Sequence, residues 1–170
     1  MRIAFYGGRQ AGMITLLTIL SLKHEVIYVF AEDIIVEQIA RNLKIPLIIK
    51  SEINNKKAID LLKKANIDLL VCSHGKKILT EDVLKLNCIN LHPCLYQYKG
   101  SDPITKLIKD KNNLASVGVH RMSHEVDEGE VIVELFKEVE LDSVANVYNQ
   151  LYPVYAEAII VALRKLENEN

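Results

Sequence analysis

Several features that mark particular classes of protein are scarce or missing in this sequence of 170 residues. Cysteine occurs three times, as Cys72, Cys88 and Cys94, and no two of these form a C-x-x-C pair. An odd number of cysteines with this spacing argues against a disulfide framework and against a zinc site. It favours a reducing compartment, where thiols stay unpaired. We therefore expect neither structural disulfides nor a metal centre.

Long apolar runs are missing as well. The N-terminal sequence MRIAFYGG leads directly into a strand pattern and lacks the charged start and long apolar stretch of a signal peptide. No apolar run reaches the ~20 residues that a membrane-spanning helix needs. These absences predict a cytoplasmic protein without a membrane partner.

A basic surplus is missing too. The 21 lysines and arginines are offset by 22 acidic residues, which gives a net charge of −1. A protein that holds nucleic acid by its phosphates usually shows a basic surplus or a basic face. We therefore expect no nucleic-acid partner. Repeats and low-complexity linkers are also lacking, and the length fits one domain over residues 1–170.

What the sequence does have is a regular alternation of strand-like and helix-like segments. This is the pattern of βαβ units, and it predicts an α/β fold: a Rossmann-like, mostly parallel twisted sheet with helices on both faces. Apolar and β-branched runs predict strands at 2–6, 24–30, 46–49, 68–72, 88–91, 116–122 and 130–138. Helical spacing predicts helices at 11–22, 33–42, 54–65, 102–108 and 143–166, with a short helix after residue 80.

Local signals refine three of these helices. Thr80 and Asp102 are predicted N-cap residues, and Pro103 suits the first helical position. Pro153 should kink the last helix, because proline removes a backbone donor and crowds the preceding turn.

The residues suited to chemistry lie where strands of the predicted sheet end. In the segment INLHPC (89–94), alternate side chains of a strand share a face, so Asn90 and His92 should point the same way. In the segment VDEG (126–129), Asp127 occupies a turn between two strands, where its carboxylate could meet them. Ligands of open parallel sheets bind beyond the carboxyl ends of the strands, so both segments are candidates for a site.

Such a set of side chains suits acyl transfer to an amine. The carbonyl oxygen becomes an oxyanion, which amide or imidazole N–H groups can stabilise. The attacking amine must lose a proton and the leaving nitrogen must gain one, and a histidine tuned by a carboxylate can move that proton.

The segment INLHP (89–93) resembles the Asn-x-His-Pro motif of the 10-formyltetrahydrofolate-dependent formyltransferases. The downstream sequence is similar too, with KG at 99–100, a proline at 103, GVHRM at 118–122 and VDEGEVI at 126–132. The resemblance implies that Asn90, His92 and Asp127 are the catalytic residues. It also implies the family's Rossmann-like fold.

The same resemblance names the formyl donor, 10-formyltetrahydrofolate. Its reduced pterin is expected between the segment 77–79 and the loop 123–127, held largely by backbone groups. The donor-binding residues so implied are Lys77, Ile78, Leu79, Met122, Ser123, His124 and Val126. His120 is expected to support the site by orienting Asp127 or a water molecule. Cys94 is two residues from His92 and could form a Cys–His nucleophile, but the family reaction needs no thiolate, so packing is the favoured interpretation.

The acceptor is inferred by comparing the branches of the family. The glycinamide ribonucleotide branch usually has Gly-Ser-Asn after its first strand to hold a phosphate, and here the sequence is GGRQ (7–10). The methionyl-tRNA branch carries a further domain and must hold RNA. The resemblance is therefore nearest to enzymes that formylate small amines, amino sugars among them. A formyltetrahydrofolate hydrolase and a catalytically silent folate-binding module remain as alternatives, and the oligomeric state is open.

Overall fold

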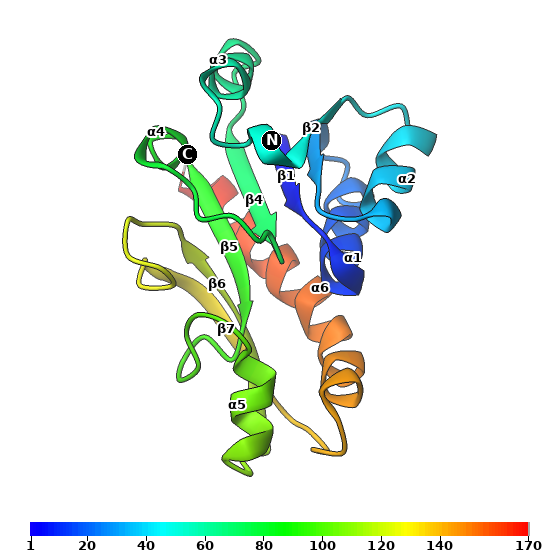
Figure 1. Ribbon diagram of the computed structural model, residues 1–170, viewed down its shortest axis with the longest axis vertical. Helices are drawn as coiled ribbons and strands as arrows, with labels where there is room; N and C mark the ends of the chain where they lie inside the picture. Colours follow the sequence, from blue (N-terminus) through cyan, green and yellow to red (C-terminus); the bar gives the residue numbers. More distant parts are fainter. Residues whose placement is uncertain (170) are drawn as a thin grey trace. The chain divides into compact units, whose positions relative to one another are not determined.

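A computed structural model describes residues 1–169 and shows strands alternating with helices (Figure 1). In chain order the elements are β1 (Arg2–Gly7), α1 (Arg9–Ser21), β2 (Glu25–Ala31), α2 (Ile34–Asn42), β3 (Leu47–Ile48), the 3-10 helix η1 (Lys50–Glu52), α3 (Lys56–Lys64), β4 (Leu69–Ser73), α4 (Glu81–Leu84), β5 (Cys88–Pro93), α5 (Pro103–Lys109), β6 (Leu114–Arg121), β7 (Val131–Glu138) and α6 (Val144–Asn168).

The strands form a mixed, mostly parallel sheet, which confirms the predicted fold class. Their order is β3-β2-β1-β4-β5-β6-β7. The pairs β1–β2, β1–β4 and β2–β3 are parallel, whereas β6 and β7 are antiparallel. Within residues 1–169, no helix combines the length and the apolar character that crossing a membrane requires.

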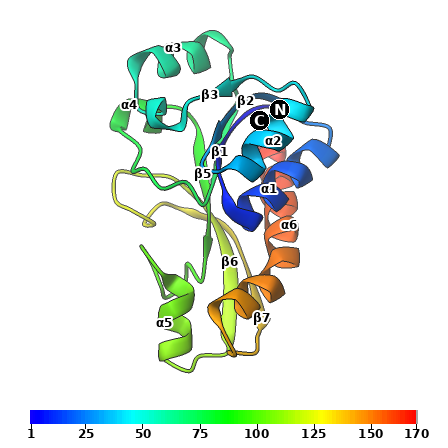
Figure 2. The same cartoon turned by 45° about the vertical axis from the view of Figure 1, so that its right-hand side comes forward.

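The chain falls into two compact units, of which the first comprises Met1–Asn90. Its strand β1 is a continuous apolar run because it is buried on both faces: Ile3, Ala4 and Phe5 are fully buried. Helix α1 packs against β1, β2 and β4. Helices α1 and α2 lie on one side of these strands and α3 on the other (Figures 1 and 2).

Capping side chains fix where two helices of this unit begin. One carboxylate oxygen of Asp33, Oδ1, accepts two backbone N–H groups in the first turn of α2, each at 3.1 Å. Asn55 Oδ1 accepts a backbone N–H group of α3 at 3.0 Å. These bonds satisfy amides that have no partner within the helix. The second oxygen of Asp33 accepts the backbone N–H of Arg9, the first residue of α1, so one carboxylate serves the N-termini of two helices.

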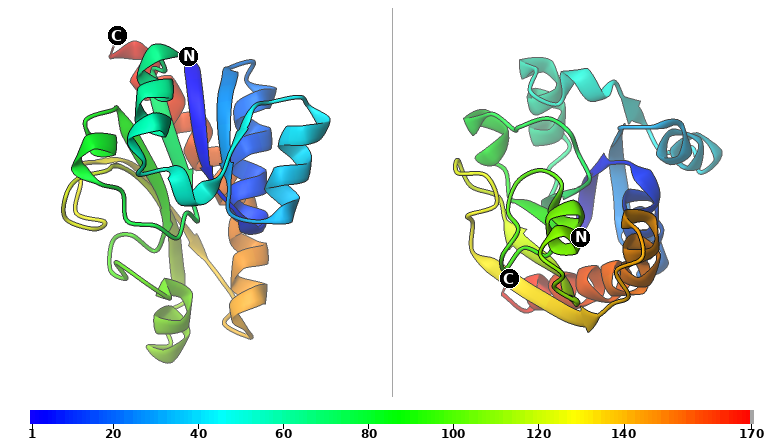
Figure 3. Two further views of the ribbon diagram at one scale, coloured as in Figure 1. Left: turned by 45° about the horizontal axis from the view of Figure 1, so that its top comes forward. Right: turned by 60° about the horizontal axis from the view of Figure 1, so that its bottom comes forward.

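The second unit begins at Leu91. Its antiparallel strands β6 and β7 lie side by side, and α6 runs along them (Figure 3). Helix α6 begins at the N-cap Ser143, whose Oγ accepts the backbone N–H of Asn146 at 3.1 Å. The helix continues through Pro153, and the kink expected there stays a prediction. The buried face of α6 consists of Val147, Leu151, Val154, Tyr155, Ala158, Ile159, Ala162, Leu163 and Leu166.

The predicted N-cap positions of α4 and α5 are confirmed, but the capping hydrogen bonds are missing. Thr80 and Asp102 do stand at the N-cap positions of α4 and α5, but neither side chain makes a capping hydrogen bond. Asp102 has a left-handed backbone, with φ 56° and ψ 43°. An N-cap side chain reaches the first-turn amides from an extended backbone, so this conformation directs the carboxylate elsewhere. Pro103 begins α5, as predicted.

Candidate active site

A buried histidine–carboxylate pair lies in the second unit. His92 belongs to β5, and Asp127 lies in the turn between β6 and β7. The His92 Nε2 atom is 3.1 Å from Asp127 Oδ2. The exposed fractions of the two residues are only 8% and 9%. Two side chains separated by 35 positions in the sequence are therefore in direct contact, away from bulk water.

The Asp127 carboxylate has two further donors besides His92. The backbone N–H of Gly100 donates to Oδ2 at 2.9 Å. The ring nitrogen Nε2 of His120 lies 3.4 Å from Oδ1. Burial alone would raise the pKa of the Asp127 carboxyl, but the hydrogen bonds from His120 and His92 and the nearby positive charge hold this pKa far below its usual range. The Asp127 carboxylate is therefore ionised at neutral pH.

The contacts of His92 define which of its ring nitrogens carries a proton. Nε2 faces two acceptors, the carboxylate of Asp127 and the carbonyl oxygen of Gly100 at 3.0 Å, so it must be a donor. Nδ1 is the buried side-chain polar atom without a hydrogen-bond partner among residues 1–169. Burial lowers the pKa of His92, but the hydrogen bond and the charge of Asp127 outweigh it, so the pKa is raised. An imidazole near neutral pH thus keeps one nitrogen available for a reacting group.

The turn that carries Asp127 depends on two backbone features. Asp127 has φ 57°, a left-handed conformation that aspartate and asparagine adopt more readily than most residues. Gly129 passes so close to β6 that a Cβ atom there would lie 1.7 Å from the carbonyl oxygen of Arg121. The backbone N–H of Arg121 donates to Glu130 at 2.8 Å and closes the hairpin. Glycine at 129 is therefore required for the close approach that places the carboxylate.

His120 lies behind the carboxylate, as its expected supporting role requires. Its exposed fraction is 1%. Nδ1 is 2.9 Å from the carbonyl oxygen of Arg121, which is an acceptor. The other nitrogen faces Asp127. Gly100 was missed as a contributor because it acts through its backbone, although the KG pair at 99–100 drew attention to it.

The structure places the remaining predicted residues on the expected segments. Asn90 is half-buried, two positions before His92 on β5, and is the last residue of the first unit. In the first unit, the loop after β4 carries Lys77, the 75%-exposed Ile78 and the buried Leu79. In the second unit, the loop after β6 carries the half-buried Met122 and the exposed Ser123, His124 and Val126. The joint action of these residues on one ligand stays a prediction.

Cys94 is a poor candidate for a nucleophile. Its side chain is fully buried, and burial raises the pKa of its thiol to about 11. Only the thiolate is nucleophilic, so the group is inert near neutral pH. Among residues 1–169, no group of three histidine, cysteine or acidic side chains is arranged to hold a metal ion.

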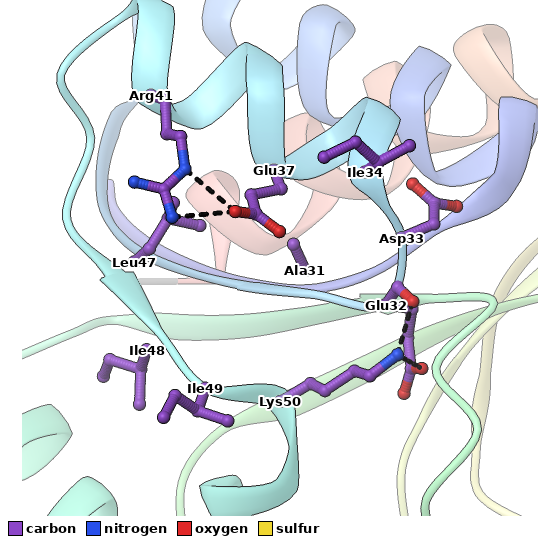
Figure 4. Close-up of a pocket in the computed structure, with 10 residues that line it drawn as sticks. All are labelled: Ala31, Glu32, Asp33, Ile34, Glu37, Arg41, Leu47, Ile48, Ile49 and Lys50. Atoms are coloured by element: carbon purple, nitrogen blue, oxygen red, sulfur yellow. Dashed lines mark hydrogen bonds and ion pairs between the residues drawn. The ribbon is translucent and has the colours of Figure 1, made fainter.

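A hollow that the sequence did not reveal lies in the first unit, lined by residues from β2 through α2 to β3 and Lys50 (Figure 4). Its volume is about 440 Å³. Two ion pairs cross its wall, Glu37 with Arg41 and Glu32 with Lys50. The lining residues are Ala31, Glu32, Asp33, Ile34, Glu37, Arg41, Leu47, Ile48, Ile49 and Lys50.

Comparisons with known proteins identify the family. The formyl transferase family model matches residues 21–163. The methionyl-tRNA formyltransferase of Thermotoga neapolitana is 32% identical over 140 residues, which is 78% of this chain and 44% of that protein. The chain thus spans less than half the length of this curated relative.

Solved structures share the fold. Phosphoribosylglycinamide formyltransferase from Campylobacter jejuni superposes with a TM-score of 0.82 at 20% identity, covering 98% of this chain and 97% of that one. HypX from Aquifex aeolicus in complex with tetrahydrofolic acid gives a TM-score of 0.77 at 18% identity and covers 99% of this chain and 27% of that one. These likenesses show the fold, and the match over residues 21–163 shows more: the chain belongs to the formyl transferase family.

Proposed function

We propose that this chain transfers a formyl group from 10-formyltetrahydrofolate to the amine of a small molecule. The observation that carries the proposal is the buried His92–Asp127 pair, which leaves the His92 Nδ1 atom without a partner among the described residues. Such an atom, beside an ionised carboxylate, suits a hydrogen bond to a reacting group. Membership of the formyl transferase family and the tetrahydrofolic acid bound to HypX support folate as the donor.

The proposed chemistry is direct attack of the amine nitrogen on the formyl carbon. A new C–N bond forms, the bond to the folate nitrogen breaks, and one proton moves from the attacking to the leaving nitrogen. His92, together with the amide of Asn90, would stabilise the oxyanion that develops on the formyl oxygen. Asp127 holds His92 as a donor and raises its pKa, so the imidazole can carry positive charge when the oxyanion forms. Asp127 also assists the transfer of the amine proton, by orienting and polarising the imidazole of His92.

Two observations favour a small, unphosphorylated acceptor. The first is the net charge of −1, which gives no electrostatic advantage for binding RNA. The second is Asp33, whose carboxylate already accepts the first backbone amide of α1. The glycinamide ribonucleotide branch uses the residues after its first strand to hold a phosphate, and here a carboxylate at that point would repel one.

The proposal is tested with the purified chain. A stable analogue of 10-formyltetrahydrofolate is titrated calorimetrically into the wild type and into Asp127→Asn. Formyl transfer is then assayed against a panel of amino sugars and other small amines, by mass spectrometry of the product. Saturable binding followed by a formylated amine supports the proposal. Release of formate independently of any amine would identify a hydrolase instead, and no binding at all would overturn the choice of donor.

A further inference from the structure

The segment 75–80 in the first unit is held in place by side chains from distant parts of the chain. It lies between β4 and α4 and belongs to neither a helix nor a strand. Backbone groups in such a segment lack the ladder of hydrogen bonds that fixes regular structure, so other groups must define their positions. Three side chains do so here: Tyr6, Glu32 and Asn54.

The first anchor is a buried Tyr6–Glu32 pair. The Tyr6 hydroxyl donates to Glu32 Oε1 at 2.5 Å and accepts the backbone N–H of Lys77 at 2.9 Å. The same Oε1 atom accepts the backbone N–H of Lys76 at 3.2 Å. Tyr6 and Glu32 are 1% and 8% exposed, so little water competes for these bonds. At Gly75 a Cβ atom would lie 2.3 Å from the Tyr6 ring, so the chain is pressed against the anchor.

Lys50 keeps Glu32 in its charged, accepting form. The Lys50 Nζ atom is 3.3 Å from Glu32 Oε2 and donates to the Glu32 carbonyl at 2.6 Å (Figure 4). Burial by itself raises the pKa of Glu32, but the hydrogen bonds from Tyr6, from the Lys76 amide and from Lys50 lower it below the usual value. The bond to Lys76 is therefore charge-assisted, which makes it stronger than a neutral one.

The second anchor is the side-chain amide of Asn54. Its Nδ2 donates to the carbonyl of Ile78 at 2.9 Å, and its Oδ1 accepts the backbone N–H of Thr80 at 3.0 Å. One amide thus fixes two backbone groups on either side of Leu79. In this arrangement Leu79 is buried and Ile78 is 75% exposed. The backbone of the segment therefore has a defined conformation, although it belongs to no helix or strand.

We propose that Tyr6, Glu32 and Asn54 are positioning residues for the formyl donor. They fix the backbone of the segment 76–80 before the donor binds, so that the reduced pterin meets groups already in place. This inference rests on the proposed function and on the expectation, implied by the family resemblance, that the segment 77–79 contacts the pterin. A preorganised segment avoids the ordering cost that a loop pays on binding, so loss of an anchor weakens donor affinity. None of the three side chains takes part in the chemical step.

Asn54→Ala is the main test, and Asn55→Ala is its matched control. The two residues are neighbours of the same type, but Asn55 caps α3 and does not bond to the segment. In Asn54→Ala we expect the KM for 10-formyltetrahydrofolate, and the Kd of its stable analogue, to rise about tenfold, because two hydrogen bonds to the segment are lost. The kcat should stay within about twofold, since the catalytic groups are untouched.

Asn55→Ala should lower the thermal stability and leave the KM for the donor unchanged. Asn54→Asp keeps an acceptor for Thr80 but cannot donate to Ile78, so its KM should fall between those of the wild type and Asn54→Ala. Tyr6→Phe should raise the KM in the same direction. Circular dichroism verifies that each variant is folded.

The outcomes separate the inference from the proposed function. If the wild type binds the analogue and Asn54→Ala binds it equally well, the positioning role is overturned and the proposed function stands. If Asn54→Ala lowers kcat with KM unchanged, the role is overturned as well. If the wild type binds no analogue, the proposed function fails, and this inference fails with it.

Discussion

Replacing Asp127 with asparagine removes the charge of the buried carboxylate and keeps its shape. Asparagine also tolerates the left-handed backbone at this position, where φ is 57°, so the turn itself should survive. Alanine would be a poorer choice, because it would combine the loss of charge with backbone strain. The expected losses can be worked out from the three donors that face the carboxylate.

The asparagine side chain has one acceptor oxygen, and its other terminal atom is a donor. The carboxylate of Asp127 accepts from His92, His120 and the backbone N–H of Gly100, and one amide oxygen cannot serve all three. At least one buried donor then faces another donor. Removing one partner of a buried ion pair costs roughly 3–5 kcal/mol. Because Asp127 keeps 9% of its surface exposed, we expect the low end, about 3 kcal/mol of unfolding free energy.

Formyl transfer should fall by roughly 10²–10³-fold in Asp127→Asn, since His92 loses the charged partner that orients it and raises its pKa. The carbonyl of Gly100 still accepts from His92, but the charge of Asp127 no longer opposes the effect of burial, so the pKa of His92 should fall from its raised wild-type value. A proton NMR titration of the imidazole C–H signals measures both. The part of the stability that His92 gains from the pair is present below pH 6.5 and is lost as the pH rises through the raised pKa. Chemical denaturation at several pH values should therefore show this loss in the wild type only.

Glu128→Gln is the control for this substitution. Glu128 is the next residue and pairs with Lys99 on the surface, where such an ion pair contributes at most about 1 kcal/mol. The Glu128→Gln substitution should leave the transfer rate and the pKa of His92 unchanged. A folded Asp127→Asn variant with the wild-type transfer rate would refute the assignment of Asp127 to the chemistry.

Three further substitutions test the site and its frame. Cys94→Ala should keep the formyl-transfer rate within about twofold, because a buried thiol with a pKa of about 11 is no nucleophile; a loss of ~10²-fold would show that it is one. Gly129→Ala should destabilise the protein by at least about 1–3 kcal/mol in urea denaturation, because its Cβ would collide with the carbonyl of Arg121; an unchanged midpoint would contradict the close approach. Ser143→Ala should lower the unfolding free energy by about 1 kcal/mol with no effect on activity, because it removes only the cap of α6; full stability would mean that this cap contributes nothing.

Much of the fold could be predicted because short apolar runs in the sequence mark the buried strands. β1 and β4 are continuous apolar runs, and every residue of β4 is buried, which is the environment that such runs indicate. The strand and helix ends moved by a residue or two, since fraying and capping decide them. Asp102 shows why a cap is harder to predict: the residue type suits the position, but its backbone is left-handed, and nothing local in the sequence specifies that.

In the candidate site, too, side chains within sequence motifs could be predicted, whereas contacts made by backbone groups or by distant residues could not. The contact of His92 with Asp127 agrees with the expectation that a carboxylate in this turn could meet the strand end, and the family resemblance had grouped the two residues. The role of Gly100 could not be predicted, since it acts through its backbone groups. The anchors of the segment 75–80 were also missed, because Tyr6 and Lys77 are 71 positions apart and only the folded chain brings them together.

The carboxylate of Asp33 already occupies the position at the N-terminus of α1 where a free anion could bind. Because this carboxylate is part of the chain, its effective concentration at the helix end does not depend on the solution. A free phosphate or sulfate ion would have to displace it and would also lose translational entropy on binding. Assays in phosphate buffer should therefore leave this helix end undisturbed. Any inhibition by phosphate would have to arise elsewhere in the molecule, which makes such an experiment a simple way to find a second anion-sensitive surface.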